Sequence, residues 1–217
     1  MRSSLSTELR VIFLASISVA VLGIPIDQTN SCNDSANDLR IVSRAEWGAR
    51  PAKDREQMAI SPTPYVVVHH GGIATYCHDE KMCSSIVRSY QNLHMDDRGW
   101  FDIGYNFIIG EDGNAYEGRG WDNRGAHAPG YNQQSIGICV IGDFTDRLPN
   151  NAALRTLNDL IAYGVKIGKI QTDYHVLGHR QARNTECPGN TFYKYVQQLP
   201  RWTSCPVPIG EGTASIE

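Results

Sequence analysis

The sequence predicts an α/β fold in which a central mixed β-sheet is flanked by helices. Two continuous apolar runs, residues 65–69 and residues 135–141, are rich in β-branched side chains and have the length of strands buried on both faces. Segments with helical periodicity lie between and after these runs, and alternating strands and helices favour a sheet covered by helices. The turn Glu111-Asp112-Gly113 between two shorter apolar segments indicates a β-hairpin.

The first half of the domain begins with an amphipathic turn over residues 43–51, which Trp47 should anchor. The buried strand at 65–69 follows. Residues 84–94 then place Ile86, Tyr90 and Leu93 near helical spacing, which predicts a helix that stops before Gly99.

The second half contains a hairpin, a buried strand, a long helix, a short strand and a final helix. Pro149-Asn150 is a start signal for the long helix, and Gly168 is a stop signal. The expected ranges, in order, are hairpin strands 105–109 and 114–117, strand 135–141, helix 152–167, strand 176–177 and helix 190–199.

The N-terminus has the features of a secretory signal peptide. Arg2 and Arg10 precede a short apolar run that ends in small residues, with cleavage after Gly23 or, alternatively, after Ala20. We therefore expect a secreted, extracellular protein with a signal peptide at 1–23, an N-terminal segment at 24–39, one domain at 40–205 and a mobile tail at 206–217. No later segment is long and apolar enough to cross a membrane.

The formal net charge of −3 argues against a nucleic-acid partner, because sequence-independent binding to nucleic acid depends on clustered basic charge. The sequon Asn33-Asp34-Ser35 permits glycosylation, although short sequons also occur by chance. We expect a monomer.

Three residues of the sequence suit a catalytic zinc site. His69 ends the first apolar run, and His179 and Cys187 flank a polar loop near the C-terminus. Two imidazoles and one thiolate leave a fourth corner of the Zn²⁺ tetrahedron open for water, and active sites of open α/β sheets gather at strand ends. A histidine is more often a satisfied surface or core group than a ligand. The spacing alone leaves both interpretations open, since five further histidines are present: His70, His78, His94, His127 and His175.

Tyr105 adds a second indication, because it begins an apolar strand segment. A phenol at that place is able to hydrogen-bond a water at the metal or a developing oxyanion. The alternative is that Tyr105 is an ordinary amphipathic strand residue.

Together, five segments resemble the animal peptidoglycan recognition proteins, in particular the short, secreted, amidase-type members. The resemblance covers roughly residues 40–203. The segments are YVVVHH at 65–70, GYNFIIG at 104–110, YEGRGW at 116–121, GAH at 125–127 and GHRQARNTECPG at 178–189.

The resemblance implies a zinc-dependent N-acetylmuramoyl-L-alanine amidase with the fold of phage-type amidases. It acts in innate immunity and cleaves the amide between the lactyl group of N-acetylmuramic acid and L-alanine of bacterial peptidoglycan. His69, His179 and Cys187 match the zinc ligands of the family, Tyr105 its catalytic tyrosine and Thr185 an auxiliary threonine. Family members that bind without cleaving usually carry serine in place of Cys187, whereas this chain keeps the cysteine.

The same resemblance implies a set of peptide-contacting residues. The pair Gly99-Trp100 together with Arg119 accompanies binding of diaminopimelate-type peptidoglycan, because a guanidinium pairs with the extra carboxylate. The candidate contacts are His70, His94, Gly99, Trp100, Arg119, Trp121, His127, Tyr131 and Asn132. Packing is an equally good explanation for Trp121 and Tyr131.

The family pairs the equivalents of Cys77 and Cys83, which implies a disulfide here in a secreted protein. Many relatives also link an N-terminal cysteine to one in the long helix, where this chain has Tyr163, so we expect Cys32 to pair with Cys205. Cys139 lies in a buried strand and should be a free thiol.

Two other functions remain open at this point. One is a non-catalytic peptidoglycan receptor that activates immune signalling, against which the intact set of catalytic residues argues. The other is a zinc-stabilised structural module, which would need a fourth protein ligand.

Overall fold

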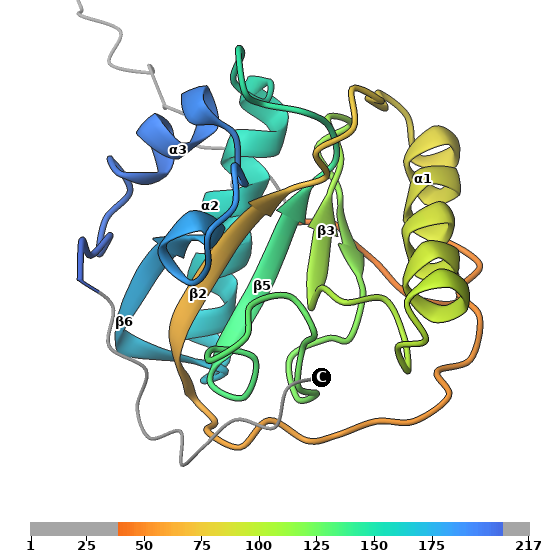
Figure 1. Ribbon diagram of the computed structural model, residues 1–217, viewed down its shortest axis with the longest axis horizontal. Coiled ribbons are helices and arrows are strands. Elements are labelled where there is room, and N and C mark those ends of the chain that lie inside the picture. Colours follow the sequence, from red (N-terminus) through yellow and green to blue (C-terminus); the bar gives the residue numbers. More distant parts are fainter. Residues whose placement is uncertain (1–38, 206–217) are drawn as a thin grey trace, which may run out of the picture. The chain divides into compact units, whose positions relative to one another are not determined.

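Six strands form one mixed sheet in the computed structural model, which describes residues 39–205. Their order across the sheet is β1-β4-β3-β5-β2-β6 (Figure 1). The strands are β1 (Ile41–Val42), β2 (Thr63–His70), β3 (Phe107–Ile109), β4 (Ala115–Glu117), β5 (Ser135–Val140) and β6 (Ile170–Gly178).

The centre of the sheet is parallel. β2 pairs in parallel with β5 on one side and with β6 on the other, and every residue of β2 and β5 is buried. This confirms the prediction of strands covered on both faces. β3 runs parallel to β5 but antiparallel to β4, so the predicted hairpin is present and the sheet is mixed.

The helices lie on opposite faces of the sheet. The helix α2 (Asn151–Lys166) and the helix α3 (Asn190–Val196) contribute to a core with the even-numbered residues of β2, Val66 and Val68. The helix α1 (Glu80–Asn92) packs on the other face, where a second cluster contains Cys139. Figure 1 shows α2 behind β2 and β5, and α1 beside β3.

Polar caps set the starts of two helices, and α1 begins earlier than its apolar periodicity indicates. Asp79 accepts a hydrogen bond from the amide of Met82 at 2.8 Å, so α1 begins at Glu80 instead of residue 84. Asn150 accepts one from Ala153 at 2.9 Å, and α2 begins at Asn151.

Four other elements also differ from the prediction. β6 has nine residues rather than two, because its first half is a polar, largely exposed edge that no apolar pattern marks. The two-residue strand β1 was too short to predict. β3 begins at Phe107, so Tyr105 precedes the strand, and α3 ends at Val196.

The turn at the start of the domain is present, and Trp47 is fully buried within it, donating from Nε1 to the carbonyl of Glu117 at 2.8 Å. The described residues contain no helix that is long and apolar enough to span a bilayer. The expected signal peptide, residues 24–38 with the Asn33 sequon and Cys32, and the tail at 206–217 lie outside the described residues.

Candidate active site

Three segments meet at the carboxyl end of the central strands and bring the predicted metal residues together. His69 is in β2, His179 begins the short 3-10 turn that follows β6, and Cys187 lies in the loop before α3. Their ligand atoms all lie within 4.8 Å of one another. Nδ1 of His69 is 3.8 Å from Sγ of Cys187, and the ring centroids of His69 and His179 are 4.3 Å apart.

This arrangement fits Zn²⁺. Zn–N bonds of about 2.0 Å and Zn–S bonds of about 2.3 Å place the two ligand atoms about 3.5 Å apart in a tetrahedral site. The 3.8 Å separation of His69 Nδ1 and Cys187 Sγ is close to that value. In addition, Nε2 of His179 is buried and has no hydrogen-bond partner among the described residues.

The protonation states of the two imidazoles suit metal binding. Burial lowers the pKa of His69 well below its ordinary value and that of His179 to about 4, so both rings are neutral at physiological pH. Burial raises the pKa of the Cys187 thiol to about 12. A bound metal ion would therefore displace the proton from Cys187.

The loop that carries Cys187 is held by Arg180, a residue that the sequence analysis did not single out. The backbone amide of Arg180 donates to the carbonyl of Cys187 at 3.0 Å, and its guanidinium donates to the carbonyl of Glu186 and to Oδ1 of Asn190. In the sequence, the one indication of a role for Arg180 is its position directly after His179. The carbonyl groups that it binds come next to it only in the folded protein.

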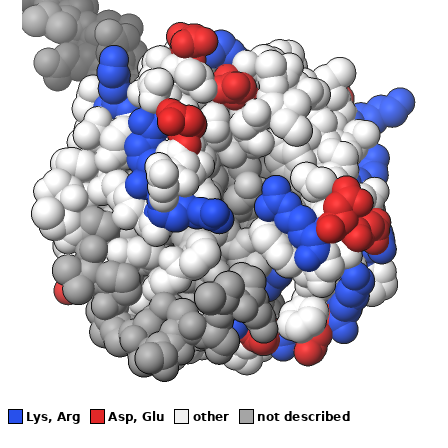
Figure 2. Space-filling model, in the orientation of Figure 1, with Lys and Arg blue, Asp and Glu red and all other residues white. Residues whose placement is uncertain are grey.

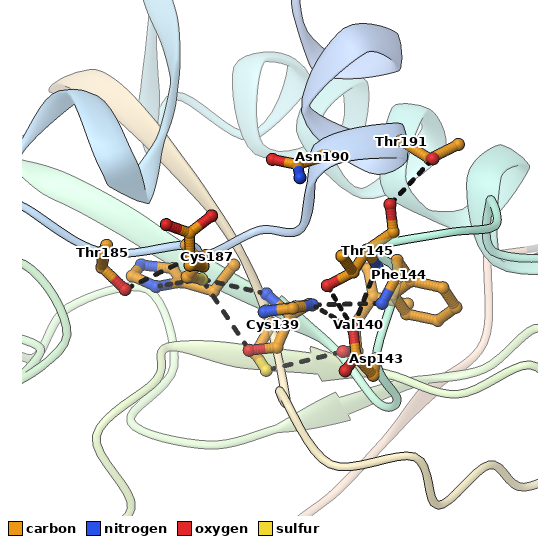
Figure 3. Close-up of polar contacts among 12 residues, drawn as sticks. Cys139, Val140, Asp143, Phe144, Thr145, Thr185, Cys187, Asn190 and Thr191 are labelled. Atoms are coloured by element: carbon orange, nitrogen blue, oxygen red, sulfur yellow. Dashed lines mark hydrogen bonds and ion pairs between the residues drawn. The ribbon is translucent and has the colours of Figure 1, made fainter.

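Thr185 also acts on this loop. Its hydroxyl accepts a hydrogen bond from the amide of Cys187 at 3.3 Å, and the two side chains lie next to each other in Figure 3. Thr185 thus lies beside the candidate metal residue Cys187, and its contact with that residue is structural.

His70 links β2 to the loop after β5. Its Nδ1 accepts a hydrogen bond from the amide of Phe144 at 3.2 Å and lies 3.7 Å from a carboxylate oxygen of Asp143. Its own amide donates to Sγ of Cys187. The imidazole of His70 therefore adjoins the metal residues and has a fixed orientation.

Tyr105 lies beside His69, with ring centroids 5.2 Å apart. Burial raises the pKa of Tyr105 well above its ordinary value, so the phenol stays protonated. A neutral phenol at this distance from His69 is a hydrogen-bond donor for an oxyanion.

His127 lies behind His69. Nε2 of His69 and Nδ1 of His127 are 3.0 Å apart, and the rings are almost perpendicular. His127 is only 7% exposed, and burial lowers its pKa to about 3. The side-chain oxygen of Asn132 accepts hydrogen bonds from the amides of His127 and Ala128, each at 2.8 Å.

The rings of His94 and Trp100 lie against each other near Tyr105. Their ring centroids are 4.8 Å apart, and Arg98 lies over the indole at 5.0 Å. Nδ1 of His94 accepts a hydrogen bond from the amide of Gly104 at 2.9 Å. Gly99, directly before Trp100, has φ +70°, a conformation that favours glycine.

Arg119 is fixed by backbone carbonyls. Its Nε donates to the carbonyl of Ile103 and its Nη1 to the carbonyl of Arg124, both at 2.8 Å. Arg119 also lines a polar cavity of about 40 Å³ together with Arg44 and Asp102. None of the three metal residues lines this cavity.

Two of the predicted contact residues pack against other side chains, with Trp121 partly buried and Tyr131 buried. Trp121 lies against Phe107, with ring centroids 4.3 Å apart, and against Gly164 of α2. Tyr131 is 4% exposed and stacks edge-on against Tyr65. The structure thus does not bring Trp121 to the histidines.

The cysteines differ in state. Cys77 and Cys83 form the expected disulfide, and Cys139 is a buried free thiol. Cys205 is exposed and forms no disulfide with any residue in the described range. Because Cys32 lies outside that range, the Cys32–Cys205 pair stays a prediction.

Comparisons with known proteins point to one family. The family described as Amidase_2, N-acetylmuramoyl-L-alanine amidase, matches residues 60–190. Peptidoglycan-recognition protein LB of Drosophila melanogaster is 43% identical over 176 residues, which cover 81% of this chain and 75% of that protein.

Solved structures show the same similarity. Wild-type Drosophila PGRP-LB has a TM-score of 0.74 at 44% identity and covers 76% of this chain and 96% of its own. Peptidoglycan recognition protein-LE in complex with tracheal cytotoxin, described as monomeric diaminopimelic acid-type peptidoglycan, has a TM-score of 0.73 at 40% identity and covers 75% and 95%. The chain therefore belongs to the amidase-type peptidoglycan recognition proteins.

Proposed function

We propose that this protein is a zinc-dependent N-acetylmuramoyl-L-alanine amidase that binds and hydrolyses bacterial peptidoglycan. The convergence of His69, His179 and Cys187 within 4.8 Å carries this proposal. These three side chains supply two neutral nitrogens and one sulfur and leave a fourth position open, which is the ligand pattern of catalytic rather than structural zinc.

The reaction adds water across the amide between the lactyl group and L-alanine. The oxygen of water bonds to the lactyl carbonyl carbon, the C–N bond breaks, and the alanine nitrogen takes up a proton. When bound, zinc supplies Lewis acidity that lowers the pKa of water and polarises the scissile carbonyl.

The residues of this chain supply orientation and hydrogen bonds. Tyr105, protonated because of its burial, donates from its hydroxyl to the carbonyl oxygen as negative charge develops there. Thr185 and Arg180 hold the loop of Cys187 in place through its amide and its carbonyl. The ligand set is therefore positioned before substrate arrives.

We further propose a preference for diaminopimelate-type peptidoglycan. Two backbone carbonyls hold Arg119 through Nε and Nη1, which leaves other N–H groups of its guanidinium for a carboxylate. Figure 2 shows lysine and arginine side chains on both sides of the middle of one face, with acidic side chains beside them. The similar PGRP-LE, which was solved with a diaminopimelic acid-type ligand, supports the same choice.

The remaining parts of the proposal follow from the sequence and the family. The protein would be secreted, act as a monomer in innate immunity and carry a cleaved signal peptide. A receptor that binds peptidoglycan without cleaving it is the alternative, and the presence of Cys187 and Tyr105 favours the enzyme.

One experiment separates the two functions. The purified protein is assayed for zinc content and for release of stem peptides from muropeptides by mass spectrometry. We expect one zinc ion per chain and a product with a free L-alanine amine. A zinc-loaded protein that binds muropeptides and releases no stem peptide would be the receptor.

A further inference from the structure

We propose that His127 is a positioning residue for the metal site, which accepts a hydrogen bond from Nε2 of His69 and thereby leaves Nδ1 of His69 to bind zinc. This inference rests on the zinc site of the proposed function and assigns a residue behind it. His127 would touch neither the metal nor the scissile bond.

The first observation is the direction in which the two nitrogens of His69 point. Nδ1 lies 3.8 Å from Sγ of Cys187, on the side of the other metal residues. Nε2 lies 3.0 Å from Nδ1 of His127. A neutral imidazole has one proton, so an Nδ1 that binds metal requires the proton to be on Nε2. Nε2 of His69 is then the donor and Nδ1 of His127 the acceptor.

The second observation is that the protein reserves a place for the imidazole of His127. Gly125 and Gly137 line this place, and a Cβ at either glycine would overlap Cδ2 of the ring. Gly137 is in β5, directly opposite Val67 of β2, so the ring occupies space on the central sheet that a side chain would otherwise fill. Glycine within a strand often marks such a close approach.

The third observation concerns the backbone of His127. Oδ1 of Asn132 accepts hydrogen bonds from the amides of His127 and Ala128. The family resemblance implies a substrate contact for Asn132, and its side-chain oxygen fixes this loop. The fixed loop, the space beside Gly125 and Gly137, and the hydrogen bond to His69 together set the orientation of the His127 ring.

A histidine that binds metal through one ring nitrogen needs a neutral hydrogen-bond acceptor for the proton on its other ring nitrogen. Such second partners fix the tautomer and the ring orientation of the ligand, and their loss typically lowers metal affinity by about 10- to 100-fold. Simple packing would not require Nδ1 of His127 to face Nε2 of His69, the ring nitrogen that does not point toward Cys187.

The experiment compares two substitutions with different chemistry at the same place. His127→Phe keeps a flat ring but removes the acceptor. His127→Asn removes the ring but keeps an oxygen close to the position of Nδ1. His175→Phe, which changes an exposed histidine, is the matched control. Zinc dissociation constants are measured by competition with a chromophoric chelator, and circular dichroism verifies folding.

We expect His127→Phe to weaken zinc binding by about 10- to 100-fold, with His127→Asn recovering most of the loss and His175→Phe equal to wild type. A folded His127→Phe that binds zinc within about threefold of wild type would overturn the inference. Equal losses in the Phe and Asn variants would also overturn it, since they would indicate packing rather than acceptance of a proton.

A measurement on the wild type covers the case in which the variants do not fold. Long-range ¹H–¹⁵N spectra of the zinc-loaded protein report the tautomer of each histidine. We expect protons on Nε2 of both His69 and His127, and a proton on Nδ1 of His127 would contradict the inference. A wild type that binds no zinc would overturn the proposed metal site as well, whereas a failure confined to His127 would leave that site intact.

Discussion

The backbone amide of His70 donates a hydrogen bond to the sulfur of Cys187 across 3.3 Å, although 117 residues separate the two in sequence. The contact brings the thiol to the end of β2, beside His69. It also opposes the effect of burial on the pKa of Cys187, because an amide proton directed at sulfur favours the thiolate.

Replacement of Cys187 by serine should abolish zinc binding and cleavage while muropeptide binding remains. Serine lacks the soft, ionisable sulfur that completes the ligand set, and the rest of the site is unchanged. Metal analysis, stem-peptide release and calorimetric titration with a muropeptide measure the three properties. Cys139→Ala, at a buried thiol one strand away, should keep the wild-type zinc content. Cleavage by zinc-free Cys187→Ser would contradict the mechanism.

Arg119→Lys should reduce cleavage of diaminopimelate-type muropeptides and leave lysine-type cleavage nearly unchanged. A lysine keeps the charge but cannot bind two carbonyls and a carboxylate at once, so the bidentate pairing is lost. Loss of one desolvated charged hydrogen bond corresponds to about 1.5–3 kcal/mol, or roughly 10- to 100-fold in kcat/KM. Rates on muropeptides that differ only in the third stem residue test this. Equal wild-type rates on both substrates would show that the enzyme lacks the preference.

Asp102→Ala should strongly destabilise the domain. The carboxylate is buried and binds Arg44 at 2.9 Å, Gln91 at 2.7 Å and the amide of Ile103 at 2.8 Å. Removing one partner of a buried ion pair typically lowers the free energy of unfolding by about 3–5 kcal/mol. Urea unfolding measures the loss.

The matched control for Asp102 is the exposed ion pair of Arg50 with Asp96. Asp96→Ala should change stability far less, because solvent screens an exposed pair. Equal effects of Asp102→Ala and Asp96→Ala would mean that burial does not decide the strength of these pairs.

His94 should make stability depend on pH. Burial, assisted by Arg98 and Arg119, lowers the pKa of His94 to about 3 in the folded protein, whereas an unfolded histidine has a pKa near 6.5. Between these values only the unfolded chain binds the proton. Stability is therefore complete above about pH 6.5 and falls as the pH decreases toward 3.

The contribution of His94 between pH 7.5 and pH 5 should be about 2 kcal/mol. His94→Asn keeps an acceptor for the amide of Gly104 and removes the titrating ring. Urea unfolding of the metal-free proteins at both pH values should show a smaller difference in the variant. If the variant lost as much stability between pH 7.5 and pH 5 as the wild type, the pH dependence would come from the other buried histidines.

Peptide mapping without reduction should find two disulfides, Cys77–Cys83 and Cys32–Cys205, with Cys139 and Cys187 reduced. The first pair is in the structure. Replacing both Cys77 and Cys83 by alanine should lower the free energy of unfolding by about 2 kcal/mol, because the closed loop is short. A mapped disulfide at Cys187 would remove the proposed metal ligand.

The sequence indicates the candidate metal residues because individual side chains carry their chemistry. His69, His179 and Cys187 have the required atoms, and the two histidines lie at or just beyond the end of a predicted strand. Capped helix starts and the polar half of β6 were harder, since apolar periodicity does not report on them.

The residues behind the site could not be predicted in the same way. The partners of Arg119 and Arg180 are backbone carbonyls, which exist at every position and become specific only through the fold. For the same reason, the sequence placed His127 and Asn132 among the substrate contacts without indicating that one lies against His69 and the other fixes its loop.

Gly137 illustrates how far the requirements of a reaction centre extend into its scaffold. This residue has no functional group and belongs to a strand whose neighbours are ordinary core side chains. Yet even a methyl group there would evict an imidazole that lies against His69. In a mutational scan scored for zinc retention, position 137 should tolerate as little change as the ligands themselves. Such a scan alone would therefore make Gly137 look like a residue of the reaction centre.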